Sequence, residues 1–213
     1  MSILYSNDEI TRVGGAGYGH IGGFFQFKKG GDIFALSNNH VIADLNRCAK
    51  GDPVCRYKNS NEQLGTLAYW YVIQPGAVNT KPDAAFFKVD REQAQPRWYN
   101  NHRPKYFCYA EEGLEVQLHT SGESRGIVRG LNRRNTAVEM DGEPYWFENL
   151  FTIESLNANP FSIGGDSGSL VYCGDDYLMG IIVGGDPSRL ISYALPFVNV
   201  IFKEGFSMEI AEV

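Results

Sequence analysis

Short apolar runs recur along the chain, and Gly, Asn and Asp residues separate them. Most runs are rich in aromatic and β-branched residues, and they are too short to form helices. They cover residues 24–27, 33–36, 66–73, 84–89, 114–118, 126–130, 147–153, 169–173, 178–183 and 190–194. This spacing predicts an all-β sandwich or barrel built from many short strands.

Two turn signals and one helix signal complete the pattern. The segments "KKGGD" and "MDGEP" stand where hairpin turns are expected, because both combine glycine with polar turn-forming residues. After Pro196, the apolar residues Phe197, Val200 and Ile201 follow the spacing of a helix. Since Pro196 suits a helix start and Gly205 a helix end, we predict one short helix between them.

The segment from residue 90 to residue 113 interrupts the strand rhythm. It is polar and aromatic and contains two prolines. A segment of this kind suits a connection between two groups of strands. We therefore predict two domains, residues 1–98 and residues 99–213.

Composition supports a globular fold and excludes some functions. The 213 residues are 43% hydrophobic and 21% charged, with a net charge of −6. This acidic balance argues against nucleic-acid binding, and the basic segment 129–134 is interpreted as a solvated loop. No signal peptide or membrane-length apolar segment is found, which predicts a cytoplasmic protein that does not bind membranes. We therefore expect the four cysteines to be reduced thiols, and we predict no metal site.

The segment "FSIGGDSGSLVY" contains Ser167, which is either a nucleophile or a serine in a glycine-rich turn. A nucleophilic serine needs a base, a group that orients the base, and donors for the oxyanion. His40 is the best candidate base, because an apolar strand leads into it through small polar residues. His102 and His119 are interpreted as surface or structural residues, and His20 lies among glycines before the first strong strand.

Asp83 is the candidate orienting group, because it stands immediately before an apolar strand in "KPDAAFFKV". Alone, it would be interpreted as an ordinary turn residue. The order His40, Asp83, Ser167, however, is the chain order of the chymotrypsin triad. It places His and Asp in the first group of strands and Ser in the second, so that a cleft between the groups would bring them together.

Four motifs carry a resemblance to the trypsin-like, chymotrypsin-fold serine peptidases. "GGDSGS" resembles their nucleophile loop, and "ALSNNHV" resembles their base-containing turn, closest to the bacterial HtrA-type branch. "PDAAFF" resembles the aspartate motif of that branch, and "HTSGESRGIV" resembles the opening of a second barrel. The resemblance implies two six-stranded antiparallel β-barrels with a short C-terminal helix, and no cofactor.

The resemblance also implies a mechanism. His40 would act as general base and then general acid, Asp83 would orient it, and Ser167 would form an acyl-enzyme. The backbone N–H groups of Gly165 and Ser167 would form the oxyanion hole.

The same resemblance implies the residues of a substrate pocket. One wall would contain Phe161, Ser162 and Ile163, the other Val183, Gly184 and Gly185, with Ser192 to Ala194 at the base and Asp186 and Arg189 at the rim. Phe161 stands where trypsins carry an acidic residue. We therefore expect a small or apolar side chain before the cleaved bond, rather than Lys or Arg.

Asp166 leaves two interpretations open. "TRVGG" resembles a shortened activation site, so cleavage after Arg12 could free Val13 to pair with Asp166. Alternatively, Asp166 caps backbone N–H groups or meets an internal base.

Three functions remain on the sequence alone. The first is an active endopeptidase with a narrow range of protein or peptide substrates, or one dedicated partner protein. The second is an inactive barrel that serves as a binding module, and the third is a self-processing protein whose single cleavage is its task. The oligomeric state stays open.

Overall fold

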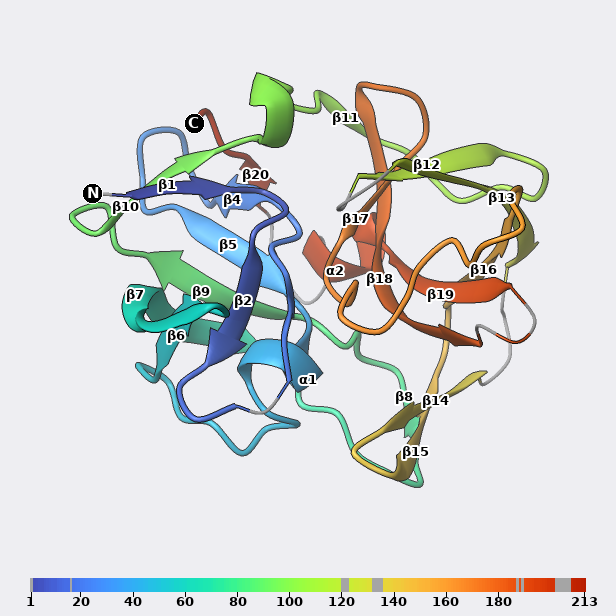
Figure 1. Cartoon of the computed structure of the whole chain (residues 1–213), viewed down its shortest axis with the longest axis horizontal. Helices are drawn as coiled ribbons and strands as arrows, with labels where there is room; N and C mark the ends of the chain where they lie inside the picture. Colours follow the sequence, from blue (N-terminus) through green and yellow to red (C-terminus); the bar gives the residue numbers. More distant parts are fainter. Residues whose placement is uncertain are drawn as a thin grey trace.

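The computed structural model describes residues 2–15, 17–119, 123–131, 136–186, 188, 190–201 and 208–213. The chain forms two β-sheet assemblies that lie side by side (Figure 1). The first contains most of the N-terminal half, and the second most of the C-terminal half. The all-β, two-barrel fold expected from the sequence is confirmed.

The first assembly is an eight-stranded antiparallel sheet in the order β20-β4-β5-β9-β7-β6-β2-β3. Within the described residues its pairings form an open series, so it is a half-barrel rather than a closed ring. Its strands are β2 (Glu9–Arg12), β3 (Gly19–His20), β4 (Phe24–Gln26), β5 (Phe34–Ser37), β6 (Pro53–Arg56), β7 (Asn59–Trp70), β9 (Ala85–Val89) and β20 (Glu209–Ile210). A separate parallel pair, β1 (Ser2–Tyr5) and β10 (Ala94–Arg97), lies beside it.

The second assembly is a closed antiparallel ring in the order β18-β17-β12-β13-β16-β19, because β18 also pairs with β19. A short outer strand, β11 (Tyr106–Phe107), joins β18 in parallel after the single-turn 3-10 helix η1 (Tyr99–Asn101). The ring strands are β12 (Glu115–His119), β13 (Glu123–Leu131), β16 (Phe151–Ser155), β17 (Leu170–Tyr172), β18 (Tyr177–Asp186) and β19 (Ile191–Pro196).

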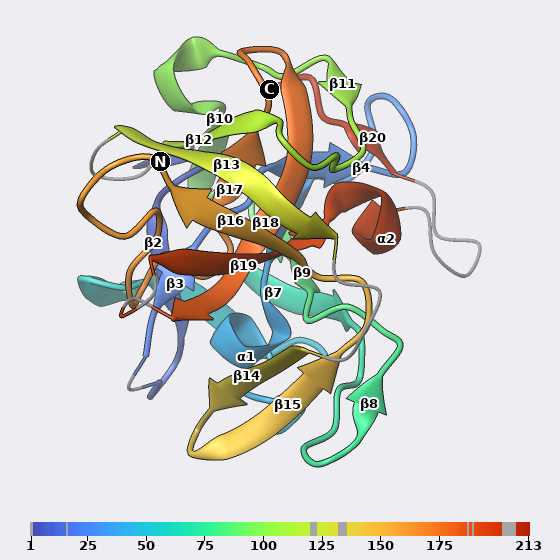
Figure 2. The same ribbon diagram turned by 90° about the vertical axis from the view of Figure 1, so that its right-hand side faces the viewer.

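A hairpin connects the two assemblies. Strands β14 (Thr136–Met140) and β15 (Glu143–Phe147) pair with each other, and β15 pairs in parallel with β8 (Val78–Asn79) from the N-terminal half. Figures 1 and 2 both show this three-stranded sheet projecting below the barrels. Its turn contains Asp141 and Gly142, both at positive φ, as the predicted "MDGEP" hairpin turn requires.

Two short α-helices are found in the described residues. The short α1 (Asn39–Ile42) follows β5 directly, and α2 (Phe197–Ile201) buries Phe197, Val200 and Ile201 as predicted. The predicted helix end at Gly205 lies outside the described residues. None of the helices in the described residues is long and apolar enough to cross a membrane.

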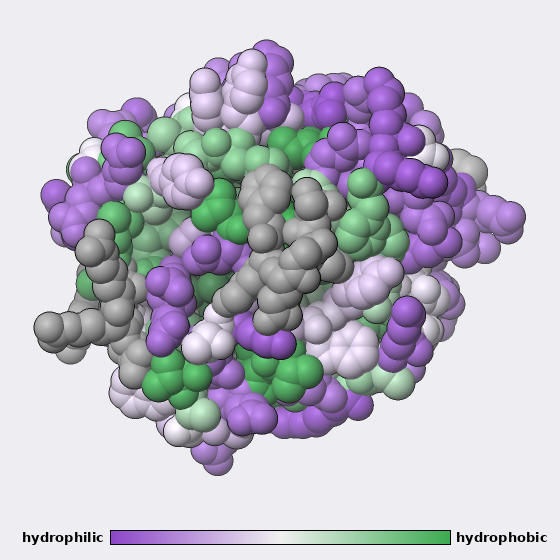
Figure 3. All heavy atoms as spheres, turned by 180° about the vertical axis from the view of Figure 1, so that it is seen from behind, coloured by the Kyte–Doolittle hydropathy of each residue, from purple (hydrophilic) through white to green (hydrophobic). Residues whose placement is uncertain are grey.

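The core consists of two hydrophobic clusters. The larger one extends from the first assembly to α2, where Phe25 packs against Phe197 with ring centroids 5.5 Å apart. The smaller one fills the closed ring and includes Phe161. Figure 3 shows the face behind, where hydrophilic and hydrophobic side chains are mixed.

One apolar run predicted from the sequence does not form a single strand. The apolar run 147–153 is divided between the end of β15 and the start of β16, because Asn149 turns the chain with φ of 63°. The boundary at residue 98 stays a prediction, although β20 shows that a late segment returns to the first sheet.

Candidate active site

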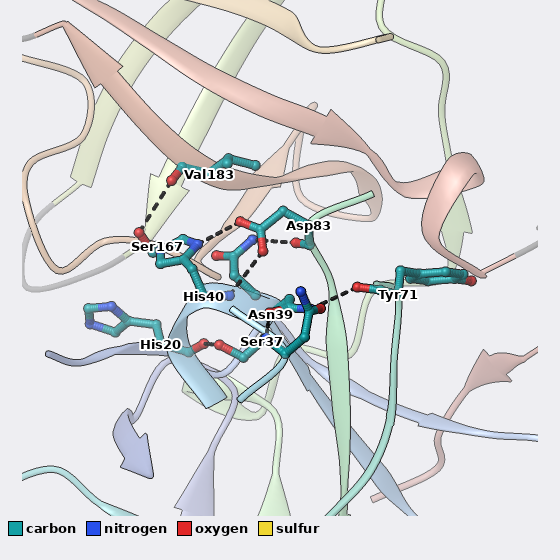
Figure 4. A network of polar contacts seen from close by, with 10 residues as sticks. His20, Ser37, Asn39, His40, Tyr71, Asp83, Ser167 and Val183 are labelled. Carbon is teal, nitrogen blue, oxygen red and sulfur yellow. Dashed lines mark hydrogen bonds and ion pairs between the residues drawn. The ribbon is translucent and has the colours of Figure 1, made fainter. Parts of the chain in front are cut away.

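His40 lies in α1, at the end of a buried strand. The neighbouring residues Val41 and Ile42 are buried, and this anchors the single helical turn, while the His40 side chain stays 20% exposed. Its Nδ1 lies 2.6 Å from Asp83 Oδ2, and its backbone N–H donates to Asp83 Oδ1 at 3.1 Å (Figure 4). Since a carboxylate only accepts, Nδ1 carries a proton and Nε2 is left as the basic nitrogen.

Asp83 is fully buried immediately before β9. Both carboxylate oxygens face His40, one toward its ring and one toward its backbone. A buried carboxylate is stabilised only when it is hydrogen-bonded or paired. The structure thus brings His40 and Asp83 together in the geometry that orients an imidazole.

Three asparagines hold this part of the site from behind. The Nδ2 of Asn38 donates to the backbone carbonyl of Asp83 at 2.8 Å, and Asn38 is fully buried. Asn39 donates to the carbonyl of Tyr71 at 2.7 Å, and it exchanges hydrogen bonds with Asn46. These bonds tie α1 to β9 and to the segment that follows β7.

Ser167 lies on the loop between β16 and β17 of the closed ring. Its hydroxyl donates to the Val183 carbonyl at 3.4 Å, a long bond, and its own carbonyl accepts from the N–H of His20 at 2.7 Å. Ser167 and His40 line the same cavity from opposite assemblies. The serine oxygen moves between staggered positions by rotation about one bond, so its present bond does not fix its direction.

Gly165 gives the loop its shape. Its φ is +99°, and a Cβ at this position would lie about 2.5 Å from the Tyr18 ring. No residue with a side chain adopts this backbone without strain, so glycine is required here. Among the described hydrogen bonds, none uses the N–H of Gly165 or of Ser167, and both predicted oxyanion donors remain available.

A cavity of about 510 Å³ extends between the two assemblies at this point. Its lining includes the serine, the histidine and residues 137–141 of the β14–β15 hairpin. Ion pairs border it: Arg12 with Asp44 at 2.9 Å, and Arg47 with Asp141 at 2.6 Å. The cavity is therefore open to solvent, has charged edges and contains both candidate reacting side chains.

No family model and no curated protein matches the sequence. Solved structures do match. Thermobifida fusca Protease A has a TM-score of 0.67 at 17% identity, covering 97% of this chain and 98% of that chain. Cellulomonas bogoriensis chymotrypsin has a TM-score of 0.64 at 17% identity, covering 97% and 100%. A glutamic acid-specific serine protease has a TM-score of 0.66 at 16% identity, covering 95% and 98%.

The chain has the chymotrypsin fold. At these identities the likeness establishes the fold alone. Of the predicted pocket residues, Val183, Gly184 and Gly185 line the cavity. Val138 of the hairpin packs so close to Gly184 that a Cβ there would lie 2.9 Å from it. The hairpin thus narrows the cavity beside these glycines.

Tyr193, from the predicted base of the pocket, also lines the cavity, whereas Phe161, Ser162 and Ile163 are not among its lining residues. Phe161 is 1% exposed and belongs to the core of the closed ring, whereas Ile163 is 60% exposed. Ser162 is buried, and its hydroxyl lies 2.7 Å from that of Ser192. Arg189 lies outside the described residues.

Asp166 caps a backbone N–H group, as one of the two interpretations expected. Its Oδ2 accepts from the N–H of Ile163 at 2.8 Å. Burial raises the pKa of Asp166, while the Ile163 bond and the nearby His20 counteract this shift. Val13 is 52% exposed in the uncleaved chain, and cleavage after Arg12 stays a hypothesis.

The remaining histidines and the cysteines lie outside the candidate site. His102 lies on the surface near Asp176, and the ring of His119 meets that of Tyr172 edge-on. The four cysteines are free thiols, and burial raises the pKa of Cys108 to about 12. In the described part of the chain, no three His, Cys, Asp or Glu side chains gather in a way that could hold a metal ion.

Sequence reasoning missed the roles of Asn38, Tyr18 and His20. Asn38 belongs to the motif "ALSNNHV", but the sequence does not indicate that its amide reaches the Asp83 carbonyl. Tyr18 and His20 lie 145 or more residues before Gly165 in the chain, and only the packing of one assembly on the other brings them to the loop that contains Ser167.

Proposed function

We propose that this protein is a serine endopeptidase that uses His40, Asp83 and Ser167 as a catalytic triad. The observation that carries the proposal is the pair of bonds from His40 to Asp83. A fully buried carboxylate orients both the ring and the backbone of a partly exposed histidine that shares a cavity with Ser167. A purely structural histidine would not need to line a cavity together with Ser167.

The chemistry follows from these positions. His40 Nε2 takes the proton from Ser167 Oγ as the oxygen attacks the peptide carbonyl, and Asp83 stabilises the resulting imidazolium. The protonated His40 then gives its proton to the leaving amine, which produces an acyl-enzyme on Ser167. A water molecule, deprotonated by His40, hydrolyses the ester and restores the free serine.

The oxyanion would be stabilised by the backbone N–H groups of Gly165 and Ser167. Both are free of partners among the described hydrogen bonds, and the positive φ of Gly165 sets the direction of its N–H. Preorganised donors of this kind contribute roughly 3–4 kcal/mol each to the transition state.

We further propose a narrow substrate range. The hairpin residues 137–141 border the cavity opposite the serine, and Val138 limits the space beside Gly184. With Phe161 buried in the core, no acidic side chain stands at that position to pair with Lys or Arg. Protein or peptide substrates with a small or apolar side chain before the cleaved bond fit this space, and one dedicated partner protein is an alternative. The cytoplasmic location stays a prediction.

One observation favours a second candidate function, an inactive binding module. The hydroxyl of Ser167 donates to the Val183 carbonyl, so in this arrangement the proton is directed away from a base. A protein of this type would bind peptides in the cleft without cleaving them.

Labelling with a fluorophosphonate probe separates these functions. The probe forms a bond from Ser167 Oγ to phosphorus and releases fluoride, so only an activated serine reacts. We expect the wild type to be labelled and Ser167→Ala to remain unlabelled. A folded wild type without label would contradict the peptidase proposal. The intact masses of both proteins test the self-processing alternative, which predicts a shortened chain in the wild type alone.

A further inference from the structure

His20 is a buried histidine that the triad does not use. It lies on β3 of the first assembly, is 7% exposed, and faces the nucleophile loop of the second assembly. A buried polar ring needs a partner. The partner of His20 belongs to the loop that contains Ser167.

The partner is the backbone of the nucleophile loop. His20 Nδ1 lies 2.8 Å from the Gly165 carbonyl oxygen, and the His20 backbone N–H donates to the Ser167 carbonyl at 2.7 Å. A carbonyl oxygen only accepts, so Nδ1 must carry the proton of this bond. One residue thus holds two carbonyls of the loop, the first through its side chain and the second through its backbone.

The side-chain bond acts on a particular peptide group, the one between Gly165 and Asp166. Its oxygen accepts from His20, and its N–H donates to the Ile163 carbonyl at 3.0 Å. This peptide stands between the two N–H groups assigned to the oxyanion hole. When its plane is fixed, the rotations that direct the N–H groups of Gly165 and Ser167 are restricted.

Two neighbours support Gly165 in different ways. The ring of Tyr18 covers Gly165, and it stacks on Tyr57 with centroids 4.1 Å apart. The loop is therefore held by van der Waals contact from Tyr18 and by a hydrogen bond from His20. Only the hydrogen bond fixes the rotation of the peptide plane, because an aromatic face places no directional demand on a carbonyl.

We propose that His20 is a positioning residue of the oxyanion hole, and that its Nδ1–H orients the Gly165–Asp166 peptide. This inference rests on the proposed peptidase function, which it deepens. His20 touches no substrate, and its effect should fall on the rate of the chemical step rather than on the affinity for a ligand.

Three substitutions at one position test this. His20→Phe keeps a flat ring but removes the donor. His20→Asn places an amide N–H near the position of Nδ1, whereas His20→Gln places the same amide one carbon farther away. The backbone bond to Ser167 remains in all three. His102→Asn, on the surface of the interdomain connection, is the matched control.

Two measurements are made on the full chain. The first is fluorophosphonate labelling as a function of probe concentration, which separates the maximal rate from the half-saturating concentration. We expect the maximal rate to fall at least tenfold in His20→Phe and His20→Gln, with little change in half-saturation, and to return to within about threefold in His20→Asn. The second is hydrogen exchange of the amides of residues 163–167, which should be faster in His20→Phe than in His20→Asn.

The possible outcomes are distinct. Wild-type labelling rates and unchanged amide exchange in a folded His20→Phe would overturn the proposal. It would also fail if His20→Asn were as slow as His20→Gln, since the bond from the Nδ1 position would then be irrelevant. A wild type that does not react with the probe contradicts the peptidase function instead, and the exchange comparison still decides whether His20 orients the loop.

Discussion

The two sides of the candidate site are built differently. On the histidine side, buried polar side chains make the supporting bonds: the Asp83 carboxylate accepts from the ring and the backbone N–H of His40, and the Asn38 amide donates to the Asp83 carbonyl. On the serine side, the loop contains glycines at positive φ, Gly165 and Gly168, and much of its support is supplied by the opposite assembly.

This difference has a physical reason. A general base must keep one ring orientation, and a network of short side-chain bonds provides that. An oxyanion hole is made of backbone N–H groups, so the backbone itself must adopt a demanding conformation. The histidine side should therefore be sensitive to changes in charge and hydrogen bonding, and the serine side to changes in backbone shape.

Asp83→Asn should have the largest effect. The amide cannot keep the correct tautomer of His40, so the labelling rate should drop by about 10⁴-fold with the fold intact. Fluorophosphonate labelling and circular dichroism measure the two effects. Asp32→Asn, at an exposed ion pair with Lys88, is the control. A loss of less than tenfold would mean that Asp83 does not orient the base.

Gly165→Ala should have the next largest effect. The added Cβ conflicts with Tyr18 and with a φ of +99°, so the loop must change shape and the labelling rate should fall by roughly 10²–10³-fold. The double variant Gly165→Ala/Tyr18→Ala removes the clash but not the backbone strain. Full recovery in the double variant would show that contact, rather than conformation, requires the glycine.

Asn38→Ala should have a smaller effect, and mainly on stability. Loss of its bond leaves the buried Asp83 carbonyl without this donor, which should lower the free energy of unfolding by about 1–3 kcal/mol. Urea unfolding measures this change. The labelling rate should fall much less than in Asp83→Asn. If both variants lost activity equally, the asparagine would have to be counted with the triad.

Asp166→Asn should have the smallest effect, visible only as a function of pH. Burial raises the pKa of Asp166 in the folded protein, so its contribution to stability is present at low pH and is lost as the pH rises through that pKa. The amide keeps an oxygen for the Ile163 N–H and does not titrate. Relative to the wild type, the variant should gain stability as the pH rises above about 4, the ordinary pKa of an aspartate. A constant difference across this range in urea unfolding would contradict the shift.

Much of the site could be predicted from the sequence because its parts occur in local motifs. His40 follows a buried strand, Asp83 precedes one, and Ser167 lies among glycines, so each position could be assigned from its neighbours. The depth of Phe161 could not, because its apolar character suits a pocket wall and a core equally. The contact from His20 to Gly165 depends on how two sheets pack, and a hydrophobic pattern does not specify that.

The pairing of β20 with β4, at the edge of the first sheet, has a consequence for folding during synthesis. On the ribosome, β4 and β5 emerge early, but this neighbour emerges only after Ser167 and the whole closed ring. Until then the β4 edge presents unpaired N–H and C=O groups that can attract other strands. The sheet beside His40 and Asp83 therefore gains its β20 neighbour only after Ser167 and the closed ring have been synthesised.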